Sequence, residues 1–451
     1  MLTQVSAFVV MAGPVVLISL WAMHQTVRIF SFRRMTIPGF WYLSYLVIIF
    51  MPAFYVAASK PDGSAKSNYL FAVESALLTA PLGVLAMSMI LRFRPIEIKP
   101  YFIAPIQKRG ANLHLVLAYS IFLLGALGLM TLYVIEVGTI PFFYLITNLG
   151  AGDEIASLRE DSFKLLNSRF TYAYAILSKL GFPFLITLAL GYYLNTKRLN
   201  WLFLFLIATG SGVLYAAFSA AKAPVAAIFV MVFIFLYLYF GGKIGITWLV
   251  PGLILIFIFP IAVILLTYPV GLLIALRAIV LRLFDDPARQ LYSYFEVVPQ
   301  HLDYLHGATI SFVAQLRGEP PFDLTNFVAL YDNPTLIERG FTSASANAAF
   351  IGDLYANFGV SGVLIGGFLA GFLMQLMQIY LIRQPKTVSN LAIYSFLMLS
   401  FWFLHFTTLQ TTLLSGGVVF VFILAWVIRI CATFLRRTGT TSVHRQMSSV
   451  P

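Results

Sequence analysis

Apolar runs of about twenty residues recur along almost the whole chain, and short polar segments separate them. The runs WLFLFLIATGSGVLYAAF (201–218) and APVAAIFVMVFIFLYLYF (223–240) lack the polar–apolar alternation of membrane-barrel strands. A bilayer core about 30 Å thick needs roughly twenty helical residues to cross it. Because backbone groups find no water partner in lipid, such runs must be helical. The pattern therefore predicts an all-α polytopic membrane protein.

We predict about eleven transmembrane helices, each of a length that suits the bilayer. They are 5–27, 37–58, 69–91, 113–135, 173–195, 199–218, 223–240, 246–268, 360–382, 389–408 and 411–432. The chain then divides into helices one to four (1–135), a first outer loop (136–172), helices five to eight (173–269), a large outer loop (270–358), helices nine to eleven (359–432) and a tail (433–451). The large loop is too aromatic for a disordered linker, so we expect it to be helical.

Basic residues follow alternate helices and orient the chain. They are Arg28, Arg33 and Arg34; Arg92, Arg94, Lys99, Lys108 and Arg109; Lys197 and Arg198; Lys243; Arg383 and Lys386; and Arg436, Arg437 and Arg445. The positive-inside rule places these segments in the cytoplasm, the N-terminus outside and the C-terminus inside. Of the 17 acidic residues, Glu97 alone falls in an inner loop and Glu74 alone within a predicted transmembrane helix. Both long loops then lie outside, which predicts a site at the outer face of the membrane.

Composition agrees with this class and excludes others. The chain is 60% hydrophobic and 10% charged, whereas soluble proteins carry about 25% charged residues. Its net charge of +12 could suit nucleic acid, but the basic residues flank the helices, so we expect no nucleic-acid partner. The single cysteine, Cys431, excludes an internal disulfide and a thiolate cluster. The N-terminus lacks the basic start of a cleavable signal peptide.

Few ionisable groups lie within the predicted helices. Glu74 and Lys179 are either functional groups or side chains that pair or snorkel at a helix end. Lys222, in a tight outer turn, would point a cation into any central outer cavity, and His405 could line the same cavity. No internal repeat is evident, which disfavours a secondary transporter.

The large loop carries the densest polar pattern. Arg282, Arg289, Glu296 and Asp303 recur every seven residues and would share one helix face, although Pro299 should break the helix before Asp303. The adjacent Asp285 and Asp286 are spaced to pair with the arginines. The stripe is either a salt-bridged amphipathic surface or a ligand site.

Two further groups add candidate chemistry. His301 and His306 are five residues apart, a poor spacing for one helix face, and no metal-binding motif accompanies them. In the first outer loop, Arg159 and Arg169 lie in a short amphipathic stretch that could equally be a solvated helix. Arginines bind phosphate through two parallel hydrogen bonds. With Arg282 and Arg289, these two could hold a diphosphate.

Three stretches resemble the Wzy-type repeat-unit polymerases of bacterial surface polysaccharide, a family that includes the O-antigen and enterobacterial-common-antigen polymerases. They are LRLFDDPARQLYSYFEVVPQHLDYLHGAT (281–309), NAAFIGDLYANFGVSGVLIGG (347–367) and AFSAAKAPVAAI (217–228). The last is similar to an outer turn in which the family often has arginine; here Lys222 keeps the charge but not the bidentate geometry. The resemblance implies a GT-C-like glycosyltransferase in the bacterial inner membrane.

The resemblance also implies the substrates and residue roles. The donor is a glycan on undecaprenyl diphosphate, the acceptor is a lipid-linked repeat unit, and the partners are a chain-length regulator and a flippase. Arginines can stabilise the diphosphate leaving group without a metal or another cofactor. We assign diphosphate binding to Arg282, Arg289, Arg159, Arg169 and Lys222, the base to Glu296, Asp303 or His301, and sugar stacking to Tyr292, Tyr294 and Tyr304.

Other functions remain open at this point. An O-antigen ligase would share the fold and donor but transfer the glycan to the lipid A core. A flippase or transporter of lipid-linked glycans would move the same molecules without chemistry, and a structural subunit would do neither. The aromatic residues could also serve as interfacial anchors.

Overall fold

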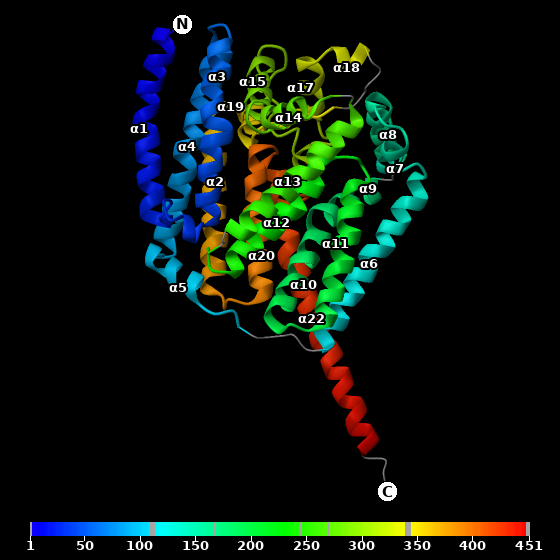
Figure 1. Cartoon of the computed structure of the whole chain (residues 1–451). Helices are drawn as coiled ribbons and strands as arrows, with labels where there is room; N and C mark the ends of the chain where they lie inside the picture. Colours follow the sequence, from blue (N-terminus) through cyan, green and yellow to red (C-terminus); the bar gives the residue numbers. More distant parts are fainter. Residues whose placement is uncertain are drawn as a thin grey trace. The chain divides into compact units, whose positions relative to one another are not determined.

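The computed structural model describes residues 2–107, 113–165, 168–243, 246–268, 270–338 and 344–447. Within these ranges every regular element is a helix (Figure 1). The chain forms two compact units. Unit 1 comprises Met1–Ile103, Gly271–Arg383 and Ser400–Thr412, and unit 2 comprises Ala104–Val270, Gln384–Leu399 and Leu413–Pro451.

Nine helices in the described ranges are long and apolar enough to cross a membrane, which identifies a multi-pass membrane protein. They are Ile37–Ser59, Ser64–Ile90, Leu113–Val137, Tyr172–Thr196, Leu199–Ala217, Lys222–Tyr239, Phe350–Arg383, Val388–His405 and Leu409–Leu435. The number is ten if the consecutive helices Ile256–Thr267 and Leu272–Phe284 count as one broken span. The predicted spans 5–27 and 246–268 fall on helices α1 (Leu2–Val27) and α13 (Ile246–Thr267), and their crossing of the membrane stays a prediction.

Unit 1 contains the N-terminal helices and the large loop. Its elements are α1, η1 (Phe32–Arg34), α2 (Ile37–Tyr45), η2 (Leu46–Phe50), α3 (Met51–Ser59), α4 (Ser64–Ile90), η3 (Pro95–Glu97), α5 (Ile98–Ile103), α14 (Leu272–Phe284), α15 (Asp286–Val297), α16 (Ser311–Leu316), α17 (Leu324–Asp332), α18 (Thr335–Glu338), α19 (Phe350–Arg383), η5 (Phe403–His405) and α21 (Leu409–Leu413). The large loop is therefore largely helical. Its exit is also helical, because α19 begins at Phe350, ahead of the predicted boundary, and Gly359 (φ 62°, ψ −151°) absorbs the kink.

The centre of unit 1 is the close contact of α4 with α19. A Cβ atom on Gly371 would lie 1.9 Å from the Ala80 carbonyl oxygen, and one on Gly83 would lie 2.0 Å from the Phe368 carbonyl oxygen. Small residues let two helix backbones approach this closely in a membrane, where van der Waals contact drives association. Helices α1 and α15 also pack on α4. Helix α4 therefore contacts the first helix, the large loop and the helix that follows that loop.

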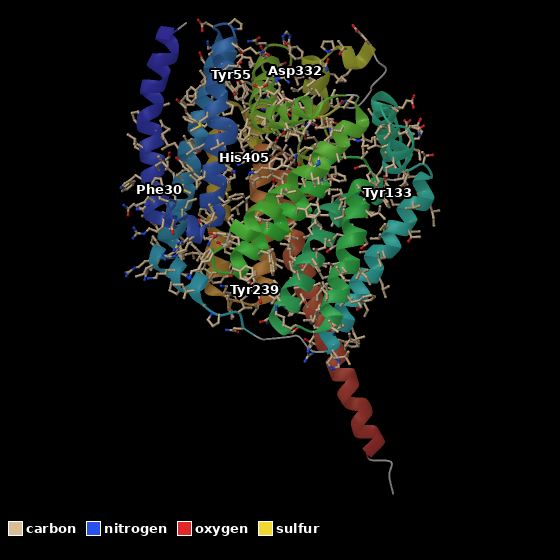
Figure 2. All side chains as sticks on the ribbon, in the orientation of Figure 1. Phe30, Tyr55, Tyr133, Tyr239, Asp332 and His405 are labelled. Atoms are coloured by element: carbon tan, nitrogen blue, oxygen red, sulfur yellow. The ribbon has the colours of Figure 1, made fainter. Side chains whose placement is uncertain are left out.

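The two ends of unit 1 differ in what they carry. Figure 1 shows α14, α15, α17 and α18 at the end where α1 begins and α3 finishes. We call this the loop end. Figure 2 shows Tyr55 and Asp332 there, with Phe30 near the opposite end of α1 and His405 in the interior. The opposite end includes Arg28, Arg92 and Arg94, and we call it the basic end.

Unit 2 contains most of the remaining helices, and aromatic stacking holds its interior. Rings of Tyr133 and Tyr174 lie 4.6 Å apart, those of Tyr133 and Phe218 lie 5.7 Å apart, and Tyr215 packs beside them. Its helices are α6 (Leu113–Val137), α7 (Pro141–Thr147), α8 (Gly152–Leu165), α9 (Ser168–Ile176), η4 (Leu177–Gly181), α10 (Phe182–Thr196), α11 (Leu199–Ala217), α12 (Lys222–Tyr239), α13 and α22 (Val418–Met447), and α20 (Val388–Trp402) begins in this unit.

Candidate functional site

The structure brings most of the predicted site residues to the loop end of unit 1. These are Arg282, Arg289, Tyr292, Tyr294, Glu296, His301, Asp303 and Tyr304. The other predicted phosphate-binding residues belong to unit 2. Arg159 is exposed on α8, and Lys222 begins α12 as a half-buried residue. Arg169 lies in α9, and its side chain is outside what the structure describes.

The arginine stripe forms, but on two helices rather than on one continuous helix. Helix α14 ends at Phe284, Asp285 caps it, and α15 begins at Asp286 with Pro287 in its first turn, where a proline costs no hydrogen bond. The end of α15 at Val297 agrees with the predicted break before Pro299. A break was expected only at Pro299, because the Asp-Asp-Pro sequence was read as helix.

The predicted pairing between arginines and aspartates is confirmed. Arg282 lies 3.7 Å from Asp286, and Arg289 lies 3.7 Å from Asp285 and 3.1 Å from Asp286. The side chains of Arg282 and Arg289 remain 70% and 51% exposed. A guanidinium has five N–H donors. Each arginine can therefore bind a further anion while it keeps its aspartate contacts.

Packing fixes α15 firmly against the ends of the membrane helices. Leu291 and Phe295 are fully buried, and the Phe295 ring lies 4.2 Å from that of Tyr355 on α19. The Tyr69 hydroxyl of α4 donates a hydrogen bond to the Ala288 carbonyl at 3.0 Å. Because the apolar face of α15 is held on both sides, the positions of Arg289 and Glu296 are set by the core of unit 1.

Glu296 forms an ion pair that joins α15 to the end of α3. Lys60 Nζ lies 3.2 Å and 3.3 Å from the two carboxylate oxygens of Glu296, and 4.7 Å from the centre of the Tyr292 ring. Both charged side chains are more than one-quarter exposed. Burial, and then the charge of Glu296, raise the pKa of Tyr292, so this phenol stays neutral. The ion pair leaves a partly open carboxylate beside a cation.

Sequence reasoning did not single out Lys60 or its neighbours. Lys66 Nζ donates to the Lys60 carbonyl at 3.3 Å and to Asp62 at 2.8 Å. A signal was present, because the segment SKPDGSAK (59–66) places two lysines in a predicted outer turn, against the positive-inside rule. Cations that depart from this rule need another role.

The three tyrosines expected to stack on sugars have different environments. Tyr292 and Tyr294 are each 2% exposed, and the Tyr294 hydroxyl donates to the Ala346 carbonyl at 2.9 Å. Both rings are used in the core of unit 1. Tyr304 is half-buried, and its hydroxyl lies 3.5 Å from that of Tyr355, which accepts from Asn68 Nδ2 at 2.9 Å. Among the three, Tyr304 is therefore the ring that a sugar can reach.

The segment after α15 carries the other two base candidates. His301 and Asp303 are both exposed, and the His301 ring lies 5.2 Å from that of Tyr331 on α17. A buried network anchors this segment to α19. Asn357 Nδ2 donates to Thr309 Oγ1 at 2.8 Å, and Asn357 Oδ1 accepts from the Gly307 N–H at 2.9 Å. The anchored segment holds His301 and Asp303 beside the end of α15.

The candidates within the membrane helices do not join this group. His405 is fully buried, with Nε2 2.7 Å from Ser44 Oγ and its ring stacked on Trp41 at 5.8 Å. The expectation that it lines an outer cavity is wrong, because α2 covers it. Lys179 lies in the π-helical segment η4 of unit 2 and is exposed. Glu74 is half-buried on α4.

The chemistry of the loop end is that of cations and carboxylates side by side. No group of three histidine, cysteine or acidic side chains suited to a metal ion occurs among the described residues. No protein-family model, curated protein or solved structure matches the chain.

Proposed function

We propose that the chain is a membrane glycosyltransferase that lengthens a bacterial surface polysaccharide. It transfers a glycan from undecaprenyl diphosphate to a sugar hydroxyl of a lipid-linked repeat unit at the periplasmic face. The observation that carries the proposal is α15, which presents exposed Arg289 and partly open Glu296 on one face. The resemblance to Wzy-type polymerases over residues 281–309 supports the same assignment.

The spacing along α15 suits this reaction. Arg289 and Glu296 are seven residues apart, which is about 10 Å along a helix. That distance allows the diphosphate to bind Arg289 and Arg282 while the acceptor hydroxyl lies near Glu296. Tyr304 is the ring available to stack on a sugar. Lys60 adds a cation beside Glu296.

The reaction needs one proton acceptor and charge stabilisation. The acceptor oxygen attacks the anomeric carbon, the bond from that carbon to the diphosphate oxygen breaks, and the acceptor proton passes to a carboxylate. Glu296 is our choice for this base, with Asp303 and His301 as the exposed alternatives. The negative charge that develops on the diphosphate is stabilised by Arg282 and Arg289. The products are a longer lipid-linked glycan and undecaprenyl diphosphate.

The test is a reconstitution of the full chain in vesicles with lipid-linked oligosaccharide extracted from the cells that encode it. A polymerase releases undecaprenyl diphosphate and gives a ladder of longer glycans on a gel. A ligase gives product only when lipid A core is added, and a flippase moves substrate across the bilayer unchanged. Either of those results would replace the proposal.

Variants locate the site. We expect Arg289→Gln to lower the rate about 100-fold or more, since removal of one preorganised donor typically costs that much. Arg277→Gln is the matched control, because Arg277 is an exposed arginine on α14 outside the ion-pair group. Wild-type activity in Arg289→Gln, with the control also active, would mean that the stripe is structural.

A further inference from the structure

The basic end of unit 1 holds a cavity of about 320 Å³ between the C-terminal turns of α1 and α4. Its polar lining comes from Gln25, Thr26, Ser88, Arg92 and Arg94. Of the two helices, α1 contributes neutral donors and acceptors, whereas the arginines follow α4. The cavity therefore combines two cations with hydrogen-bonding groups, which suits an anion.

Protein carboxylates leave these arginines available. The one acidic residue of this end, Glu97, lies 3.3 Å from Arg383 and accepts the Arg94 backbone N–H at 2.9 Å. Among the described residues, no carboxylate pairs with the guanidinium of Arg92 or Arg94. Both arginines are exposed. Arg289 contacts two aspartates, whereas Arg92 and Arg94 contact no carboxylate among the described residues. The positive charge of these two arginines is therefore not neutralised by acidic side chains there.

Exposed apolar side chains border the cavity. Met89 lines it and is 69% exposed, and the adjacent Ile90 is 65% exposed. Large exposed apolar groups at the end of a membrane helix face lipid chains. A ligand that combines a negative headgroup with acyl chains would satisfy both parts of this surface.

Backbone conformation marks Arg92 further. Its φ is 49°, a left-handed conformation that favours glycine at the residue after a helix. Arg28, after α1, has the same conformation, with a φ of 55°, but does not line the cavity. Arg92 and Arg28 therefore have the same backbone conformation, but only Arg92 lines the cavity.

We infer that this cavity binds the phosphate headgroup of an anionic phospholipid. Arg92 and Arg94 contact the phosphate, the exposed Gln25 amide is a neutral donor in the same lining, and the acyl chains lie along Met89 and Ile90. The site is on the opposite end of unit 1 from the loop end and does not depend on the glycosyltransferase assignment.

The test measures lipid binding to the detergent-purified full chain, by native mass spectrometry with phosphatidylglycerol, phosphatidylcholine and inorganic phosphate as separate probes. Wild type should bind phosphatidylglycerol in preference to phosphatidylcholine. Arg92→Gly should weaken phosphatidylglycerol binding about fivefold, the value of one cation near a membrane surface. Because glycine suits a positive φ, this variant should fold normally. Arg94→Gln should weaken binding in the same direction.

Arg28→Gly is the matched control, and its phosphatidylglycerol binding should equal that of wild type. Equal loss in Arg28→Gly and Arg92→Gly would overturn the site and leave only diffuse attraction to a basic surface. No loss in Arg92→Gly and Arg94→Gln would overturn it as well. Full displacement of the lipid by inorganic phosphate would assign the cavity to a free anion instead.

Discussion

The two ends of unit 1 hold their charges in opposite ways. At the loop end, Lys60 contacts Glu296, Lys66 contacts Asp62, and Arg289 contacts two aspartates. At the basic end, arginines outnumber the single carboxylate, Glu97. Pairing sets the positions of side chains, whereas unpaired cations create a field. The comparison indicates that position matters at the loop end and net charge matters at the basic end.

The largest effect should come from breaking the element that joins the two ends. Helix α4 supplies Lys66 and Tyr69 at the loop end and Ser88 at the basic end. Gly371→Ala would place a methyl carbon 1.9 Å from the Ala80 carbonyl oxygen, so the two helices would have to move apart. We expect a loss of about 1–3 kcal/mol in unfolding free energy, with lower glycosyltransferase activity and lower lipid binding together.

Gly128→Ala on α6 is the control, because a Cβ atom there meets nothing within 4 Å. Thermal unfolding in detergent reports the stability of both variants. A Gly371→Ala protein that loses one function and keeps the other would show that the α4–α19 contact supports only one of the two ends.

Much of this fold followed from periodicity, while the site followed only in part. Apolar runs located the membrane helices, since burial in lipid dominates their sequence. Local spacing also predicted the pairing of Arg289 with Asp285 and Asp286. The Lys60–Glu296 contact could not be predicted, because it joins residues 236 positions apart. The burial of Tyr292 was missed because an interfacial aromatic and a core aromatic look alike in one sequence.

A smaller effect should distinguish the Lys60–Glu296 ion pair from the Lys66–Asp62 ion pair. A double-mutant cycle of Lys60→Met and Glu296→Gln should give a coupling of about 1 kcal/mol, near the upper limit for a partly exposed pair. The Lys66–Asp62 pair is the control, because Asp62 is 63% exposed and its coupling should be close to zero. Both coupling energies are measured by denaturant unfolding. Equal values would mean that the Lys60–Glu296 pair stabilises the fold no more than an exposed surface pair does.

The smallest effect should come from relieving a left-handed backbone conformation at the basic end. Arg28→Gly relieves a left-handed backbone and should raise the unfolding free energy by about 0.5 kcal/mol. Arg33→Gly, in the short helix η1, has no positive φ to relieve and should lower it slightly. A stability gain in the first variant would mean that arginine is present for its charge, at a small cost to the fold. A loss there would assign Arg28 a packing role.

The length of α4 has one more consequence. Its 27 residues extend about 40 Å, whereas the hydrocarbon layer is about 30 Å thick. With both helix ends anchored by charged groups, the surplus must be taken up by tilt or by emergence into the headgroup layers. The tilt of α4 therefore depends on the thickness of the bilayer. In a thinner membrane α4 leans further, and the loop end and the basic end shift sideways relative to each other.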